Sequence, residues 1–220
     1  MNAKVTVAGG VRTKRRATTS PDQLRCDETA ERSNDSECLS KKNYTSLLLT
    51  RFPETNNHFC VVINASTRTI LVDWICRLCT ELQFPLSVYH SAITYLDMYM
   101  SIVDFQDISL YQLVGLTCAW ISTKFHLDDK QLSIDNMKEI CLGTYERAQF
   151  LEMEREILCV LDFNLSVPSL YERVVAYCML INASSVVQRF LIAAAEKYTM
   201  DGSVVRIGHL ALMGIIMSRL

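Results

Sequence analysis

This sequence of 220 residues contains little glycine and carries only a small net charge. Its seven glycines are less than half the share of about 7% that glycine usually takes. This scarcity argues against an enzyme built from glycine-rich phosphate loops and against a β-protein with many tight turns. The net charge of -2 gives no sign of a protein that binds nucleic acid by neutralising its phosphates. We therefore expect helices, and we do not expect nucleic acid as a partner.

Residue patterns typical of enzymes and metal sites are missing as well. The four histidines lie in separate segments, with no Cys, Asp or Glu at ligand spacing. Cys76 and Cys79 have the spacing of half a zinc site, but no second pair follows. The same i, i+3 spacing directs two small apolar residues to a helical core, which is the interpretation we favour. We predict no catalytic residue, no metal and no cofactor.

Hydrophobic runs long enough for a membrane are also absent. The longest apolar stretch near the C-terminus, about 207–217, is far short of the roughly 20 residues that a helix needs to cross a bilayer. The nine cysteines lie mostly within apolar periodic segments, which is typical of a reduced, intracellular protein. We therefore expect no membrane partner.

Residues 1–40 alternate basic and acidic clusters and have almost no aliphatic periodicity. Such a segment cannot fill a core, so the sequence predicts a flexible N-terminal tail. Lys14-Arg15-Arg16 is a candidate nuclear import signal, although a basic cluster this short is more often a solvated run. We take the nucleus as the expected location, with the cytoplasm as a second one.

From about residue 41, apolar residues recur at helical spacing. They predict five helices, at about 66–82, 86–102, 109–125, 133–143 and 145–161. The first is expected to be capped by Ser66 and to direct one apolar stripe inward, made of Ile70, Leu71, Trp74, Ile75, Leu78, Cys79 and Leu82. The third helix is apolar around nearly its whole circumference, which predicts that the other four surround it.

Pro168 predicts the first turn of a further helix. Two more helices are expected at about 184–198 and 203–219. The order and lengths of these three helices resemble those of the opening half of the five-helix bundle. We therefore divide the chain into a tail (1–40), a first domain (41–167) and a truncated second repeat (168–220). Because an incomplete repeat leaves apolar faces uncovered, we expect either a partner or altered packing there.

Four segments of the chain resemble, in the right order, the motifs of the cyclin box. They are Thr67-Arg-Thr-Ile-Leu-Val-Asp-Trp-Ile75, Tyr95-Leu-Asp-Met-Tyr-Met-Ser101, the segment from Gln112 to Phe125, and the segment from Met153 to Leu165. The chain is thus similar to the cyclin family over about residues 66–168. From Pro168 onward it resembles, more weakly, the family's second repeat. The resemblance implies an all-α fold, with a five-helix cyclin-box bundle followed by a truncated second repeat.

The hallmark positions of that family fall on five residues of this sequence: Arg68, Asp97, Leu113, Lys124 and Glu154. In cyclins the Lys and Glu project side by side from the third and fifth helices and bind backbone groups of a kinase. The resemblance implies the same for Lys124 and Glu154. The alternative is an ordinary surface ion pair, worth about 0–1 kcal/mol. We expect Arg68 and Asp97 to form an internal pair that joins the first helix to the second.

A second surface known in cyclins, the docking groove for substrates, maps to residues of the first and third helices. These are Thr67, Ile70, Leu71, Trp74, Arg77 and Gln112. Thr67 takes the place of a Met, and Arg77 takes the place of a Glu that meets basic docking peptides. Because Arg77 repels a basic peptide, we do not expect standard docking at this groove.

The resemblance implies a protein without catalytic activity that binds and activates a cyclin-dependent kinase. Such a subunit holds the kinase's mobile helix inward and helps to order its activation loop. The alternative is a cyclin-fold scaffold or transcription-type adaptor that activates no kinase. Other regulatory proteins are further candidate partners, through the truncated second repeat. The short second repeat, and a tail without an Arg-x-x-Leu motif, favour a specialised member, such as those that act at meiotic crossover sites, over a mitotic cyclin.

Overall fold

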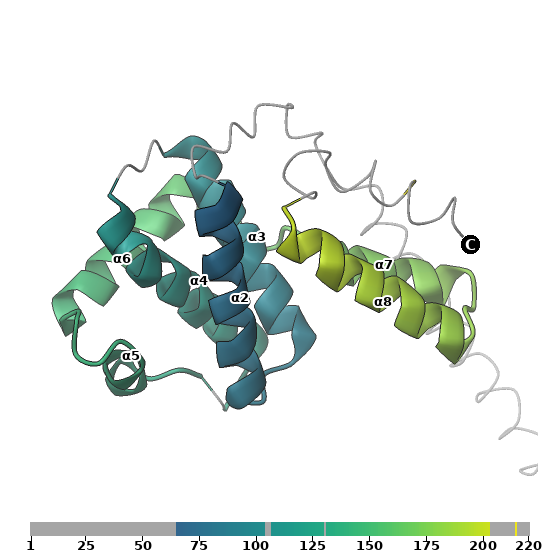
Figure 1. Cartoon of the computed structure of the whole chain (residues 1–220), viewed down its shortest axis with the longest axis horizontal. Coiled ribbons are helices and arrows are strands. Elements are labelled where there is room, and N and C mark those ends of the chain that lie inside the picture. The colour runs from purple at the N-terminus through teal and green to yellow at the C-terminus, as the bar shows by residue number, and fades with distance from the viewer. Residues whose placement is uncertain (1–64, 104–106, 130, 203–213, 215–220) are drawn as a thin grey trace, which may run out of the picture. The chain divides into compact units, whose positions relative to one another are not determined.

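The computed structural model describes residues 65–103, 107–129, 131–202 and 214. In these ranges the chain forms α-helices and one 3-10 turn, without a strand (Figure 1). The helices are α2 (Ala65–Glu81), α3 (Leu86–Ile102), α4 (Tyr111–His126), α5 (Ile134–Ile140), α6 (Arg147–Val160), α7 (Leu170–Leu180) and α8 (Ser185–Met200), and the turn η2 (Ile108–Leu110) leads into α4. The predicted all-α fold is confirmed. The tail at 1–40, with its basic cluster, lies outside the described residues, and so does the helix expected at 203–219 except for residue 214.

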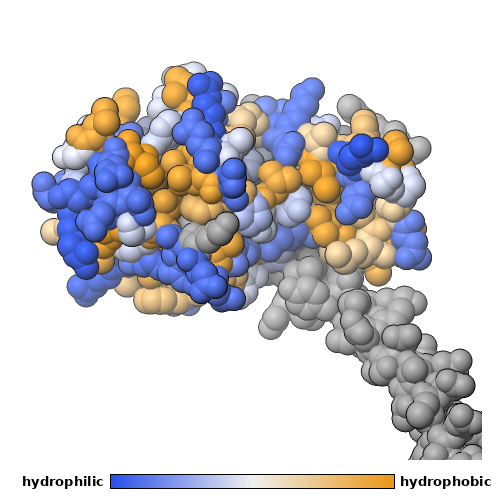
Figure 2. Space-filling model, turned by 90° about the horizontal axis from the view of Figure 1, so that it is seen from below, coloured by the Kyte–Doolittle hydropathy of each residue, from blue (hydrophilic) through white to orange (hydrophobic). Residues whose placement is uncertain are grey.

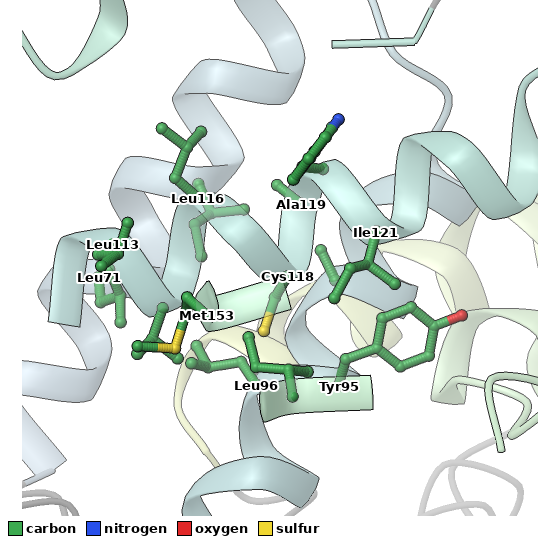
Figure 3. Packing of buried hydrophobic residues seen from close by; sticks show 14 of the residues in the cluster. Leu71, Tyr95, Leu96, Leu113, Leu116, Cys118, Ala119, Ile121 and Met153 are labelled. Atoms are coloured by element: carbon green, nitrogen blue, oxygen red, sulfur yellow. The ribbon is translucent and has the colours of Figure 1, made fainter. Parts of the chain in front are cut away.

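Helix α4 is the centre of the first bundle, as its apolar circumference predicts, although α5, the fourth predicted neighbour, packs mainly against α6. Every residue from Leu113 to Thr123 is buried, and α2, α3 and α6 all pack against this helix. Figure 3 shows Met153 of α6 among Leu71, Leu96 and Leu113, which come from three other helices. A helix that is covered on all sides gives its neighbours a rigid base.

Gly115 allows α2 to pack closely on α4. A Cβ atom at this position would lie 2.8 Å from Cδ1 of Leu71 and 3.2 Å from Cδ1 of Ile75. Both side chains belong to the core. The absence of a side chain at Gly115 therefore sets the separation of these two helices.

Helix starts follow the local capping chemistry. Ser133 caps α5, as predicted, and shares a capping box with Asn136. The helix ends at Ile140 and not at the predicted Gly143, and Leu142 already takes the left-handed conformation, at φ 52°. The start predicted at Pro168 is wrong by two residues, because Ser169 is the cap of α7 and pairs with Glu172 in a second capping box. The cap predicted at Ser66 is also wrong, since Ser66 already lies within α2.

The inward stripe predicted for α2 is too wide. Ile70 is 71% exposed and Leu82 is 39% exposed, so both lie outside the core. Val72 is fully buried in their place, and Arg68 is buried as well. The helix is therefore rotated about its axis relative to the predicted stripe, with Leu71, Val72 and Ile75 toward α3 and α4.

Helices α7 and α8 form a hairpin with a small core of its own (Figure 1). That core consists of Leu170, Val174, Cys178, Leu191 and Ala195. The hairpin also meets the first bundle, because α7 packs against α3 and α8 packs against both α2 and α3. No helix in the described part of the chain is long and apolar enough to span a membrane.

Candidate functional site

The structure brings Lys124 and Glu154 together from two neighbouring helices. Lys124 lies in the last turn of α4, and Glu154 lies near the middle of α6. The Nζ of Lys124 donates a hydrogen bond to Oε1 of Glu154 and forms an ion pair with it. The side chains are 35% and 16% exposed, respectively, so the pair lies at the surface with most of its area covered.

Helix geometry explains why a lysine lies at this point. The buried part of α4 ends at Thr123, so Lys124 is the first residue after it that reaches solvent. A cation is favoured there because the carboxyl end of a helix carries a partial negative charge. On α6, the neighbouring Met153 is buried in the core and fixes the helix face that presents Glu154.

An aromatic ring lies beneath the pair. The Nζ of Lys124 is 3.4 Å from the ring centroid of Trp120, one turn earlier on α4. Trp120 is 5% exposed. The sequence pattern indicated Trp120 only as part of an apolar circumference. The i, i+4 spacing of Trp120 and Lys124 is the signal that identifies this contact in the sequence.

The pair retains unused hydrogen-bonding capacity. An ammonium group has three N–H donors, and within the described chain Glu154 takes one of them. The Oε2 atom of Glu154 accepts no hydrogen bond from any described residue. The site can therefore offer a donor and an acceptor side by side to a neutral polar group such as a peptide bond.

Large apolar side chains are exposed on the two helices that carry the pair and in the turn after α6. Phe125 follows Lys124 and is 47% exposed, while Leu151 precedes Glu154 by one helical turn and is 42% exposed. Phe163, in the turn after α6, is 67% exposed. Figure 2 shows that hydrophobic residues also reach the surface in patches between hydrophilic ones on the face it displays. An exposed polar pair with aromatic and aliphatic neighbours is typical of a protein-binding surface.

Arg68 and Asp97 form the internal charge pair expected between the first two helices. The Nε and Nη2 atoms of Arg68 donate to the two carboxylate oxygens of Asp97, each at 2.8 Å. The side chains are 4% and 12% exposed. Burial opposes the charge on Arg68, but the hydrogen bonds and negative charge of Asp97 raise the pKa of the guanidinium above its ordinary value. Leu113, another of the five hallmark residues, is buried in the hydrophobic core of the first bundle.

Arg68 also binds the end of α8, which the sequence did not indicate. Its Nη2 donates to the carbonyl of Thr199 at 3.1 Å, and its Nη1 donates to the carbonyl of Met200 at 3.2 Å. Gly202 leaves room for the guanidinium, since a Cβ there would lie 3.1 Å from Nη1. Arg68 thus joins α2, α3 and α8.

The residues mapped to the docking groove lie on α2 and α4, but they face different environments. Leu71 is buried in the core and Ile70 is exposed. Thr67, Trp74 and Gln112 are all half-buried. Arg77 is exposed and pairs with Asp73 at 2.6 Å, one turn earlier on α2. Of the predicted set, Ile70 and Arg77 are therefore the most accessible.

The Cys76 and Cys79 pair belongs to α2 and its core packing. Cys79 is buried and Cys76 is half-buried. Burial and the neighbouring Cys76 raise the pKa of Cys79 to about 12, so its thiol stays protonated at neutral pH. The described residues contain no group of three or more His, Cys, Asp or Glu side chains arranged to hold a metal ion.

Comparison of the sequence with known proteins finds cyclins among its relatives. Residues 33–166 match the family model described as cyclin, N-terminal domain. Three similar proteins are Cyclin-A1-2 of Arabidopsis thaliana (31% identical over 112 residues, 49% of this chain and 24% of that protein), the G1/S-specific cyclin CLN2 of Candida albicans (33% over 111 residues, 49% and 23%) and Cyclin-A1 of Xenopus laevis (31% over 115 residues, 52% and 27%). The matched segment thus spans about a quarter of each relative's length.

The solved structures give the same indication for the fold. The X-ray structure of a viral cyclin from Herpesvirus saimiri superposes with a TM-score of 0.63. The alignment covers 81% of this chain and 82% of the viral chain, at 16% sequence identity. At this identity the similarity establishes the fold alone.

Proposed function

This chain belongs to the cyclin family, and on that premise we propose that it is a regulatory subunit, without catalytic activity of its own, that binds a cyclin-dependent kinase. The surface pair of Lys124 and Glu154 is the polar centre of the proposed kinase-binding face. The observation that carries this proposal is that two helices present the pair together, while two N–H donors of Lys124 and Oε2 of Glu154 form no hydrogen bond with the described residues.

The chemistry of the pair favours a peptide backbone as its target. Lys124 and Glu154 neutralise each other, so a charged partner group would gain little net attraction from them. A neutral peptide group can accept from Lys124 and donate to Glu154 without leaving a charge unbalanced. The apolar side chains of Phe125, Leu151 and Phe163 supply the hydrophobic contact that a stable interface needs around such a centre.

Activation requires that this face prefer one kinase conformation. Moving a kinase from 1% to 99% active takes about 5.5 kcal/mol of differential affinity. An interface of standard size, about 1,600 Å² in total, is sufficient to provide it. The rigid base of α4 and α6 supports this role, because a fixed surface binds one kinase conformer better than others.

The test is the double variant Lys124→Ala, Glu154→Ala in the full chain, assayed against a panel of purified cyclin-dependent kinases. We expect the chain to stay folded and its affinity for its kinase to fall by about 100-fold, because the partner's polar groups lose their hydrogen bonds. The control is Lys138→Ala, which breaks another surface Lys–Glu pair, 2.8 Å apart, and leaves Glu146, the cap of α6, in place. Undiminished binding by the double variant contradicts the proposal.

The second candidate function is a cyclin-fold scaffold that activates no kinase. A kinase assay distinguishes it from an activating subunit. Phosphorylation of a peptide substrate by the captured kinase rises several-fold if the chain is an activator and stays unchanged if the chain only tethers the kinase. We further propose a nuclear location, on the basis of the Lys14-Arg15-Arg16 cluster. Imaging of the chain in dividing and meiotic cells tests this location.

A further inference from the structure

Trp120 has a contact that core packing does not require. Its side chain is 5% exposed and lies on the central helix α4, where any large apolar residue fills the same volume. The face of its ring nevertheless carries the ammonium group of Lys124, at 3.4 Å from the centroid. We propose that Trp120 is a positioning residue, which holds Lys124 in the orientation that the partner kinase binds. This inference rests on the proposed function of the Lys124 and Glu154 pair.

Two contacts from different helices fix the ammonium group. The negative face of the indole ring attracts it from within α4. The carboxylate of Glu154 attracts it from α6. A lysine side chain that is held by the carboxylate alone keeps much of its rotational freedom, because its four-carbon chain bends easily. With the ring beneath it, Lys124 is already ordered before a partner arrives.

This ordering matters because binding otherwise has to supply it. Immobilising a flexible side chain at an interface weakens the association, and a side chain ordered in the free protein avoids that loss. The Lys124 side chain is still 35% exposed, so its position over the ring leaves it accessible to a partner. A leucine or methionine at position 120 fills the core but has no π face. The role therefore depends on the aromatic ring and not on volume.

The contact in the free chain can be measured without any kinase. The sequence has two tryptophans, so Trp74→Phe leaves Trp120 as the single fluorescent indole. In that background, Lys124→Ala removes the group that covers the ring, and we expect quenching of Trp120 by acrylamide to increase. Lys138→Ala, which removes a lysine from another helix, α5, is the control and leaves quenching unchanged. Equal quenching with and without Lys124 overturns the geometric basis of the proposal.

The role in binding is tested by a double-mutant cycle with the kinase that the full chain captures. Trp120→Met weakens binding about three- to ten-fold, whereas Trp120→Phe, which keeps a π face, retains most of the affinity. In the Lys124→Ala background, Trp120→Met has no further effect, because the residue through which it acts is absent. Thermal unfolding of each variant shows whether it is folded, and Trp120→Leu, which also lacks a π face, replaces Trp120→Met if that variant unfolds.

The possible failures are distinguishable. If Trp120→Met weakens binding equally with and without Lys124, Trp120 acts through general packing and the inference is wrong. If Trp120→Met binds as tightly as the natural chain, the ring is not needed and the inference is again wrong. If the natural chain captures no kinase from the panel, the proposed function fails, and the quenching experiment alone then decides whether the ring orders Lys124.

Discussion

Two aspartate–arginine pairs that involve α2, one shared with α3 and one within α2, differ in how much solvent reaches them. Asp97 and Arg68 are 12% and 4% exposed, and they share two hydrogen bonds. Asp73 and Arg77 are 44% and 72% exposed and form an i, i+4 pair along one helix. Water screens the second pair and is nearly excluded from the first. The same kind of ion pair should therefore have very different effects on stability.

Asp97→Asn keeps the shape of the side chain and removes its charge. We expect a loss of about 3–5 kcal/mol in the free energy of unfolding, because Arg68 stays buried without its counter-charge. The control Asp73→Asn should cost no more than about 1 kcal/mol, as for an exposed pair. Urea unfolding of both variants measures the difference. Similar losses for the two would contradict the assignment of Arg68 as a buried charge that depends on Asp97.

At the scale of elements, the helix ends decide where the chain turns. Ser133 and Ser169 each begin a helix with a reciprocal capping box. Helix α8 ends differently, since Arg68 of another helix binds the carbonyls of Thr199 and Met200. Carbonyls at a helix end have no partner within the helix and attract a cation. The end of α8 is thus completed by this tertiary contact together with its own turn, in which the N–H of Asp201 donates to the carbonyl of Lys197 and Gly202 is left-handed.

Ser169→Ala tests the capping box of α7. The hydroxyl of Ser169 accepts from the backbone N–H of Glu172 at 3.3 Å and donates to its carboxylate at 3.0 Å. Removing it should lower the free energy of unfolding by about 1 kcal/mol. Ser185→Ala, on an exposed residue in the first turn of α8, is the control and should stay within about 0.5 kcal/mol. A loss from Ser185→Ala as large as that from Ser169→Ala would show that capping is not the cause.

At the scale of the whole molecule, His126 lies where the bundle meets the hairpin. It ends α4, and its Nε2 shares a hydrogen bond with Oγ of Ser91 on α3 at 2.8 Å. Burial lowers the pKa of His126 below its ordinary value of 6.5, and the charge of Glu172 on α7 opposes this shift. The folded chain therefore binds a proton at His126 less readily than the unfolded chain does.

The pH dependence of stability follows from this sign. The contribution of His126 is complete above about pH 6.5 and is lost as the pH falls toward its lower folded value, because the unfolded chain takes up the proton first. We expect the free energy of unfolding to fall from about pH 7.5 to about pH 5.5, and His126→Gln to reduce that fall. Urea titrations at both pH values measure it. A fall that is unchanged in the variant would assign the effect to other groups.

The spacing of apolar residues along the sequence predicted much of the fold. It failed for contacts between residues that are far apart in the sequence. The apolar circumference of α4 is a property of neighbouring residues, so its central place could be predicted. The exposure of Ile70 could not, because a wide apolar stripe does not define its own edges. The contact of Arg68 with α8 could not be predicted from the sequence, because every residue has a backbone carbonyl. The two carbonyls also lie more than 130 positions from Arg68 in the sequence. The pairing of Lys124 with Glu154 came from family resemblance and not from spacing.

During translation, Arg68 is synthesised long before Thr199 and Met200, whose carbonyls it binds. At about 5–20 residues per second, the 131 positions between Arg68 and Thr199 take roughly 7–26 s to synthesise. During that interval the guanidinium has Asp97 but no acceptor from α8. A nascent chain that has not yet formed α8 therefore carries in its first bundle an arginine whose hydrogen bonds are only partly made.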